Sequence, residues 1–367
     1  MARVQTLRRR QAGLTLIELM ISMVIGLMVL GALLVVYLGS RSAYRSGDSL
    51  ARVQEGGRFA LDFIAQDGRM SGFMGCRSRN LSIDDQTMTN ITNPQVTFNG
   101  SRDGVRGFDG SNSTSIALWT NPTAATANPI TRVGSSDVLT IRRASGVQVG
   151  ISANSDPVAR TVTLRHNAIG LRNGDLAVLG NCERALVFYV TNSPALTGIG
   201  NYPTVLEYKA TGGGTGGTLG NDTVIAVPPF NVSSRAEVVR FIEISYFIGL
   251  NSAGRPSLFR AAAGTVEELV DNVEDMDILY GVDTTLPDQD GIIDVYQRAD
   301  QVTDWSRVVS ARISLLVVGP EDNVTTGAQT YTFRESTGDG VADSQTASDR
   351  RLRHVFTTTI SLRNRVL

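Results

Sequence analysis

The hydrophobic pattern begins with one unbroken apolar run near the N-terminus. Residues 14–38, LTLIELMISMVIGLMVLGALLVVYL, are interrupted only by Thr15, Glu18 and Ser22. At about 1.5 Å per residue, this stretch is long enough to cross the hydrocarbon core of a bilayer as an α-helix. The preceding leader carries four arginines and no acid, which predicts a cytoplasmic N-terminus and places everything after Leu38 outside.

Helical spacing of apolar residues continues beyond the membrane-length run. The apolar positions are Leu50, Val53, Ala60, Leu61, Phe63 and Ile64. This spacing predicts that the helix extends well past the membrane. Gly56 and Gly57 interrupt the pattern, and we expect them to loosen the helix locally. Three further glycines between residues 68 and 75 indicate where the helix ends.

Beyond residue 76, short apolar segments lie between turns rich in Gly, Asn, Asp and Ser, which predicts a β-rich head. The expected strands are residues 115–119, 137–143, 160–166, 176–180, 185–191, 205–210, 238–250, 257–261, 275–283, 309–318 and 354–363. Residues 265–273 are interpreted as a short helix, and the glycine-rich residues 212–217 as a flexible loop. We therefore expect an α+β protein whose long N-terminal helix packs on an antiparallel β-rich globular head.

Charge and composition narrow the range of partners. The formal net charge is -1, and the chain has one lysine, Lys209, so nearly all positive charge lies on scattered arginines. No specific nucleic-acid partner is predicted from this balance. The chain contains 37 glycines and few aromatic residues, which is typical of an exported, loop-rich β protein.

The two cysteines, Cys76 and Cys182, fit no metal motif. Zinc sites need close Cys/His pairs, and the chain has only two histidines, His166 and His354. Because the head is expected to be exported, a Cys76–Cys182 disulfide is the first interpretation. A bridge over that length of chain would stabilise the fold by about 4–5 kcal/mol in the chain-entropy model. Two free buried thiols are the alternative.

The sequence carries no recognisable catalytic set. It has no Gly-x-Ser-x-Gly elbow and no His-Glu-x-x-His motif, and each histidine is interpreted as structural. We therefore expect no enzyme activity and no organic cofactor.

One acidic segment is a candidate calcium loop. Asp288, Asp290 and Asp294 surround Gly291 in a spacing similar to part of a calcium-binding loop, where clustered oxygens hold a hard cation. The segment has Leu286 where such a loop begins with an acid, and it lacks the final bidentate glutamate. The alternative is a hairpin turn rich in Asp and Gly.

The junction before the apolar run resembles a type IV prepilin signal. A secretory signal has small residues after its apolar region, whereas here Gly13 precedes it. In the prepilin family, a prepilin peptidase cuts after this glycine and methylates the new N-terminal residue, and the glutamate at mature position five is needed for assembly. The resemblance implies cleavage after Gly13, methylation of Leu14 and an assembly role for Glu18.

The position of Glu18 has a physical consequence of its own. An acid inside a spanning segment costs a few kcal/mol on insertion scales, so it is a functional hypothesis by default. After cleavage, Glu18 would lie one helical turn from the new amine of Leu14. Among packed apolar helices the carboxylate must pair, either with the amine of its own chain or with that of a neighbouring subunit.

The C-terminal part carries a second resemblance. Residues 268–284, 302–317 and 350–365 are similar to the C-terminal region of PilW-type minor pilins, and more weakly to J-type minor pseudopilins of type II secretion. Residues 57–76 add to it. The resulting division is a leader at 1–13, a long helix at 14–75 with its transmembrane part at 14–38, a β-rich variable region at 76–235 and a PilW-like region at 236–367.

These resemblances imply a minor pilin of a bacterial type IV pilus, inserted in the inner membrane with a periplasmic head and later part of the pilus. The implied role is in the priming or tip complex that starts pilus assembly, with links to cell adhesion and twitching motility. Implied partners are other minor pilins, the major pilin, the inner-membrane assembly platform, prepilin peptidase and a large tip adhesin. The alternatives are a J-type pseudopilin and a membrane-anchored extracytoplasmic enzyme.

Overall fold

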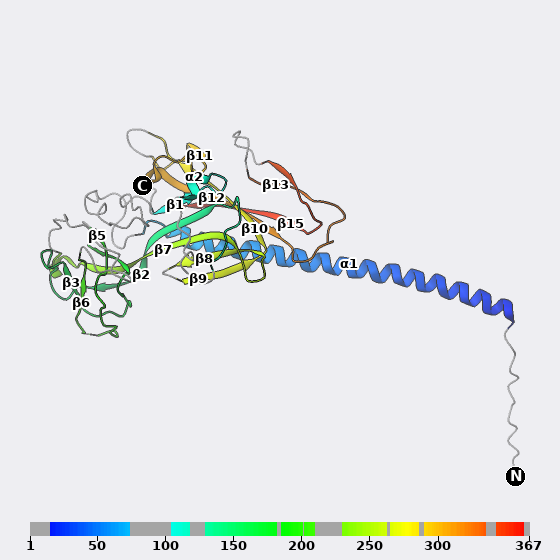
Figure 1. Cartoon of the computed structure of the whole chain (residues 1–367), viewed down its shortest axis with the longest axis horizontal. Coiled ribbons are helices and arrows are strands. Elements are labelled where there is room, and N and C mark those ends of the chain that lie inside the picture. The colour runs from blue at the N-terminus through cyan, green and yellow to red at the C-terminus, as the bar shows by residue number, and fades with distance from the viewer. Residues whose placement is uncertain are drawn as a thin grey trace, which may run out of the picture.

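The computed structural model describes residues 15–73, 104–117, 129–181, 185–200, 202–209, 230–262, 265–285, 290–334 and 343–362. One long helix runs out from a head built of antiparallel sheets, and the first turn of that helix lies at its far end from the head (Figure 1). The prediction of an α+β fold with an N-terminal helix and an antiparallel β-rich head is confirmed.

Helix α1 spans Leu16–Arg69 without interruption, 54 residues in all. It begins at Thr15, whose hydroxyl accepts a hydrogen bond from the Glu18 N–H. It ends where the Met70 N–H donates to the Asp67 carbonyl and the Ser71 N–H to the Gly68 carbonyl, and the left-handed φ of Gly72 follows. The expectation that Gly56 and Gly57 loosen the helix is wrong, because the head packs against this stretch and holds it helical.

The larger sheet has seven strands. They are β1 (Val105–Phe108), β2 (Val138–Gly150), β4 (Leu176–Gly180), β5 (Ala185–Tyr189), β7 (Glu237–Leu250), β8 (Pro256–Ala262) and β9 (Thr265–Asp271). Strand β7 is central and long: its first residues pair with β4, its last with β8, and β2 pairs along its other edge. Strand β9 pairs with β8. The sheet therefore divides, with β4 and β5 at one end and β8 and β9 at the other.

The smaller sheet has the order β11-β10-β12-β15. Its strands are β11 (Val295–Gln297), β10 (Val273–Val282), β12 (Val308–Val318) and β15 (Arg353–Ser361). Two hairpin-like pairs complete the head: β3 (Thr161–Leu164) with β6 (Thr204–Glu207), and β13 (Thr330–Thr332) with β14 (Ser344–Thr346). The short helices are α2 (Ser113–Ala117), η3 (Val232–Ser234) and η4 (Trp305–Arg307).

The described residues form four buried hydrophobic clusters, of which the two largest hold most of these elements together. The main core gathers Val53, Ala60 and Ile64 of α1 with inward residues of both sheets, such as Tyr246 and Ile313. A second core lies under β3 and β6 and includes side chains of β4, β5 and the first part of β7. We call the part of the head around this second core the distal lobe, because it lies at the end opposite the projecting part of α1 (Figure 1).

Two secondary-structure predictions are wrong. Residues 265–273 form β9 and the start of β10 rather than a helix, because backbone pairing with β8 outweighs the helix propensity of Glu and Leu, and Asn272 turns the chain at a φ of 57°. The predicted strand at 115–119 begins instead inside α2, where the Asn112 side chain accepts hydrogen bonds from two N–H groups of the first turn.

The other predicted strands are confirmed to within three residues at each end, except that β2 runs to Gly150, seven residues beyond the predicted end at residue 143. The glycine-rich residues 212–217 lie outside the described residues. Strands from both sides of residue 235 share the larger sheet, and the division into a variable and a PilW-like region stays a prediction.

Candidate functional site: the N-terminal helix and its seat on the head

Residues 16–38 of α1 project from the head, and farther along the helix Arg45 pairs with Glu321 at 3.6 Å. Every residue from 16 to 47 is exposed, and the apolar window of this helix has none of its residues buried. By length and composition the helix can cross a membrane. A helix from the core of a soluble protein would pass the same test but would be mostly buried, so the exposure favours an anchor.

Glu18 lies in the first turn of this helix. Its backbone N–H donates to the Thr15 hydroxyl at 3.3 Å, and its carbonyl accepts a hydrogen bond from the Ser22 hydroxyl at 2.7 Å. Both local bonds leave the Glu18 carboxylate exposed at the helix N-terminus, where the helix dipole favours a negative charge. Gly13 and Leu14 lie outside the described residues, so their processing stays a prediction.

The second half of α1 lies against β9, β12 and β15, and glycines allow the close approach. A Cβ on Gly57 would come within 2.3 Å of the Phe356 ring, and one on Gly68 within 3.2 Å of Ile360. Both partners belong to β15. The Phe356 ring occupies the space that a side chain at position 57 would need, which explains why this helical position holds a glycine.

Asp67 fixes the far end of the helix to the larger sheet. Its carboxylate accepts hydrogen bonds from Arg143 of β2 at 3.0 Å, Arg260 of β8 at 3.1 Å and the Tyr246 hydroxyl of β7 at 2.7 Å. Asp67 is 7% exposed. Burial and the Asp67 charge raise the pKa of Tyr246 well above its usual value. A buried carboxylate with three donors from three strands specifies one position and one rotation of the helix on the sheet.

A second buried ionic cluster joins the two sheets. Arg334 follows β13 and lies among three carboxylates: Asp137 at 3.4 Å, Asp275 at 3.1 Å and Asp277 at 3.8 Å. Its guanidinium also donates to the Met276 carbonyl at 3.1 Å. Asp137 directly precedes β2 of the larger sheet, whereas Asp275 and Asp277 lie on β10 of the smaller sheet. The Arg334 side chain therefore bridges both sheets.

The electrostatics of this cluster depend on Arg334. Burial raises the pKa of Asp137 to about 7, although the Arg334 charge and the Gly110 N–H act in the opposite direction. Burial likewise raises the pKa of Asp275 and of Asp277, again against Arg334. One cation thus compensates several carboxylates, which makes it costly to remove.

The candidate calcium segment forms the connection between β10 and β11. The Asp294 carboxylate accepts hydrogen bonds from the Thr284 N–H at 2.7 Å and hydroxyl at 2.9 Å, and Asp290 accepts one from the Ile292 N–H at 2.8 Å. Asp288 lies outside the described residues. Within the part of the chain that the structure describes, no three His, Cys, Asp or Glu side chains gather closely enough to hold a metal ion. Calcium binding stays a prediction.

The remaining candidate residues are placed as follows. Cys76 and Cys182 both lie outside the described residues, so the disulfide stays a prediction. The His354 ring packs edge-on against Phe356 at 4.7 Å on β15, and the His166 Nδ1 accepts a hydrogen bond from the Ala168 N–H.

Sequence reasoning missed Asp67 and Arg334. A signal for Asp67 was present, because it follows Ala60 and Ile64 at helical spacing on the face that proved to be buried. An acid on the apolar face of a helix indicates a buried partner. Arg334 had no such signal, because it lies 197 residues from Asp137 in the sequence and in no periodic segment.

Comparison with known proteins agrees with this geometry. Residues 245–364 match the family described as type IV pilus-assembly protein W, and residues 8–34 match the prokaryotic N-terminal methylation motif. No curated protein and no solved structure matches the chain. The first match contains β9, β12 and β15, the strands on which α1 lies, and the second covers the start of the exposed apolar helix.

The two matched segments therefore belong to one structural unit, which consists of the membrane-length helix and the strands that pack against its second half. Regions of this kind belong to structural proteins of pilus systems, which have pilin partners and associate with the membrane. The chain is a type IV pilus-related, pilin-like protein, similar to type IV pilus-assembly protein W over residues 245–364 and carrying the prokaryotic N-terminal methylation motif over residues 8–34.

Proposed function

We propose that this chain is a minor pilin of the priming or tip complex that starts assembly of a type IV pilus. The observation that carries the proposal is the continuity of α1, which is fully exposed over its apolar half and packed into the head over the rest. In such a protein the helix anchors the unprocessed chain in the inner membrane, with the N-terminus cytoplasmic and the head periplasmic, as the arginine-rich leader favours.

Prepilin peptidase would then cut after Gly13 and methylate Leu14. In the processed chain the new amine would stand four residues, about one helical turn, before Glu18. Paired within one chain, they would only neutralise each other. Paired with the amine of a neighbouring subunit, Glu18 would help to set the axial register, and this second arrangement justifies the cost of inserting an acid.

The proposed partners follow from that arrangement. Other minor pilins and the major pilin would pack beside α1, the inner-membrane assembly platform would extract the bundle, and a large tip adhesin would be displayed at its outer end. The alternative role, a J-type minor pseudopilin of a type II secretion system, uses the same helix chemistry and differs in the system served. Cross-complementation of a pilus mutant and a secretion mutant separates the two roles.

The decisive experiment compares two variants in a strain that lacks the wild-type copy. Glu18→Val should insert and be cut after Gly13 but fail to join the assembly complex, whereas Gly13→Val should stay uncut. Processing is measured by the mass of the mature chain, and piliation by counting surface pili. Normal piliation with Glu18→Val would defeat the proposal.

A further inference from the structure

The distal lobe exposes several large apolar side chains on one loop. We call residues 190–200 and 202–203, which connect β5 to β6, the β5–β6 loop. In this loop Leu196 is 61% exposed, Ile199 is 88% exposed and Tyr202 is 60% exposed. Single exposed apolar residues are ordinary on a protein surface, whereas several on one short loop indicate an interaction site.

Hydrogen bonds fix the base of this loop. The Thr197 and Thr204 hydroxyls share a hydrogen bond at 3.4 Å, which closes the loop across its base. The backbone N–H of the buried Asn167 donates to the Thr197 hydroxyl at 2.6 Å. The Tyr202 N–H donates to the Arg165 carbonyl at 3.0 Å. The apolar side chains are therefore held outward by a fixed backbone, and a partner that binds them has little further ordering to impose.

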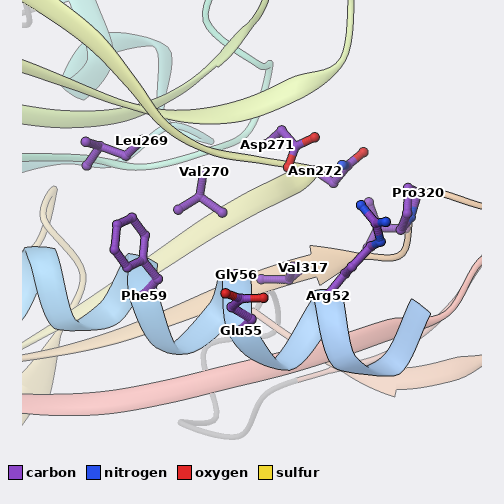
Figure 2. Close-up of a pocket in the computed structure, with 11 residues that line it drawn as sticks. Arg52, Glu55, Gly56, Phe59, Leu269, Val270, Asp271, Asn272, Val317 and Pro320 are labelled. Carbon is purple, nitrogen blue, oxygen red and sulfur yellow. The ribbon is translucent and has the colours of Figure 1, made fainter. Parts of the chain in front are cut away.

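The loop protrudes from the head, because a side chain as exposed as Ile199 has almost no neighbours. The Tyr202 ring lies against the turn beside it, since a Cβ on Gly200 would come within 2.9 Å of that ring. The pocket of about 340 Å³ between α1 and the ends of β9 and β12 is different, because this chain itself lines both of its walls (Figure 2). A protruding apolar turn needs a partner that deforms around it, and a lipid bilayer is such a partner.

Basic side chains flank the loop. Arg165 and Arg172 are exposed, and neither forms an ion pair within the part of the chain that the structure describes. The carbonyl just before Arg172 accepts a hydrogen bond from the Asn167 side chain at 2.9 Å, which places this arginine near the base of the loop. The neighbouring Asp175 carboxylate is already paired with Arg240 at 2.7 Å. Two arginines without a described acidic partner, next to exposed apolar side chains, favour an anionic and amphipathic partner.

The loop lies far from the membrane that holds α1. The distal lobe is at the end of the head opposite the projecting part of the helix (Figure 1). From Leu38, where the membrane-length run ends, to Arg69 the helix rises about 47 Å. A bilayer that meets the loop is therefore a second one and not the bilayer that the helix crosses.

We propose that the β5–β6 loop docks on a second membrane whose surface carries anionic phospholipids. Leu196 and Ile199 enter the boundary between headgroups and acyl chains, and the Tyr202 ring lies at the interface, where its apolar body is buried and its hydroxyl stays wet. Arg165 and Arg172 donate to the lipid phosphates. The inference goes beyond the pilus role and uses α1 only as an anchor.

The test keeps the anchor occupied and offers the loop a separate bilayer. The full chain is held through α1 in nanodiscs of phosphatidylcholine and mixed with sucrose-loaded vesicles of equal parts phosphatidylglycerol and phosphatidylcholine. Sedimentation of the vesicles measures the fraction of nanodiscs bound, with empty nanodiscs as the blank. We expect binding to these vesicles, and roughly ten- to thirtyfold weaker binding to vesicles of phosphatidylcholine alone.

Paired variants separate the loop from the rest of the head. Ile199→Ser should weaken binding about tenfold, because it removes an apolar side chain that the bilayer buries. Val158→Ser should change nothing: Val158 is 94% exposed but lies in the turn before β3, at the other end of the β3–β6 pair. Arg165→Gln should weaken binding to the anionic vesicles about fivefold, whereas Arg255→Gln, between β7 and β8, should leave it unchanged.

Insertion is measured at the same position. Ile199→Trp keeps a large apolar side chain, and its added fluorescence should be quenched when the anionic vesicles carry brominated acyl chains. The added fluorescence of Val158→Trp should not be quenched. Equal quenching at the two positions would contradict docking through the loop.

Three sedimentation results would also overturn the inference. The first is no sedimentation with either kind of vesicle, which is the result that a protein-binding loop would give. The second is equal sedimentation with both kinds, which would remove the role of the anionic lipid. The third is sedimentation that Ile199→Ser leaves unchanged, which would mean that α1 itself had moved into the vesicles.

Discussion

Gly57 gives the sharpest test of how the helix is seated. We predict that Gly57→Ala destabilises the head even though alanine is the better helix former. A Cβ at this position would lie 2.3 Å from the Phe356 ring, a separation at which the ring or the helix must move. Overpacking of this kind costs about 1–3 kcal/mol, against a gain of about 1 kcal/mol from helix propensity.

The neighbouring Gly56 provides a matched control. It lies in the same turn, and a Cβ there would come within 3.3 Å of the Val270 Cγ1, a contact that a shift of a few tenths of an ångström relieves. Gly56→Ala gains the same helix propensity without the severe contact. The difference between the two variants therefore isolates the overpacking term, and we expect Gly57→Ala to be less stable than Gly56→Ala by about 1–3 kcal/mol.

The measurement is urea unfolding of the full chain in detergent, followed by tryptophan fluorescence. Trp305 is suitable as a reporter because its ring packs edge-on against the buried Tyr280 at 4.8 Å. In a Phe356→Ala background the penalty of Gly57→Ala should disappear, since the ring it meets is gone. Equal stability of the Gly56 and Gly57 variants would refute the close seating of α1 on β15.

Three further predictions concern the head. Burial raises the pKa of Asp137 to about 7, so between about pH 4 and 7 the native state binds more protons at this group than the unfolded state does. Its contribution to stability is therefore lost as the pH rises. Arg334→Met should lower the free energy of unfolding in urea by about 3–5 kcal/mol at pH 8 and by less at pH 5, and an equal loss at both pH values would contradict the cluster. Mass spectrometry of unreduced periplasmic material should show a peptide linking Cys76 to Cys182, and two freely alkylated thiols would count against the bridge. Millimolar Ca²⁺ should raise the melting temperature of the wild type but not of Asp290→Ala, and an unchanged wild-type curve would reject calcium binding.

The long helix and most strands could be predicted because their periodicity is local. An apolar run of membrane length and alternating segments such as those in β7 and β12 carry their own signal. The segment that became β9 did not, since TVEELVD has the composition of a helix and becomes a strand only because β8 offers a partner. Composition alone could not decide between the two states.

The candidate site likewise has one part that a local sequence pattern identifies and another part that it does not. The signal around Gly13 and Glu18 is a short contiguous pattern, so sequence alone could identify it. The contacts that seat the helix are not contiguous: Asp67 meets donors that lie 76 to 193 residues away in the chain. Such contacts depend on how the strands are ordered in the sheet, which local patterns do not determine.

The spacing of the two helix contacts explains how an event in the membrane can reach the head. Phe356 holds α1 at Gly57 and the sheet holds it at Asp67, ten residues or about 15 Å apart, so the head can neither slide along the helix nor rotate about it without breaking both contacts. Between Glu18 and Asp67 the helix is unbroken over about 74 Å. A register set by pairing at Glu18 would therefore fix both the height and the rotation of the head, which is the condition for one subunit to present the same surface each time a complex forms.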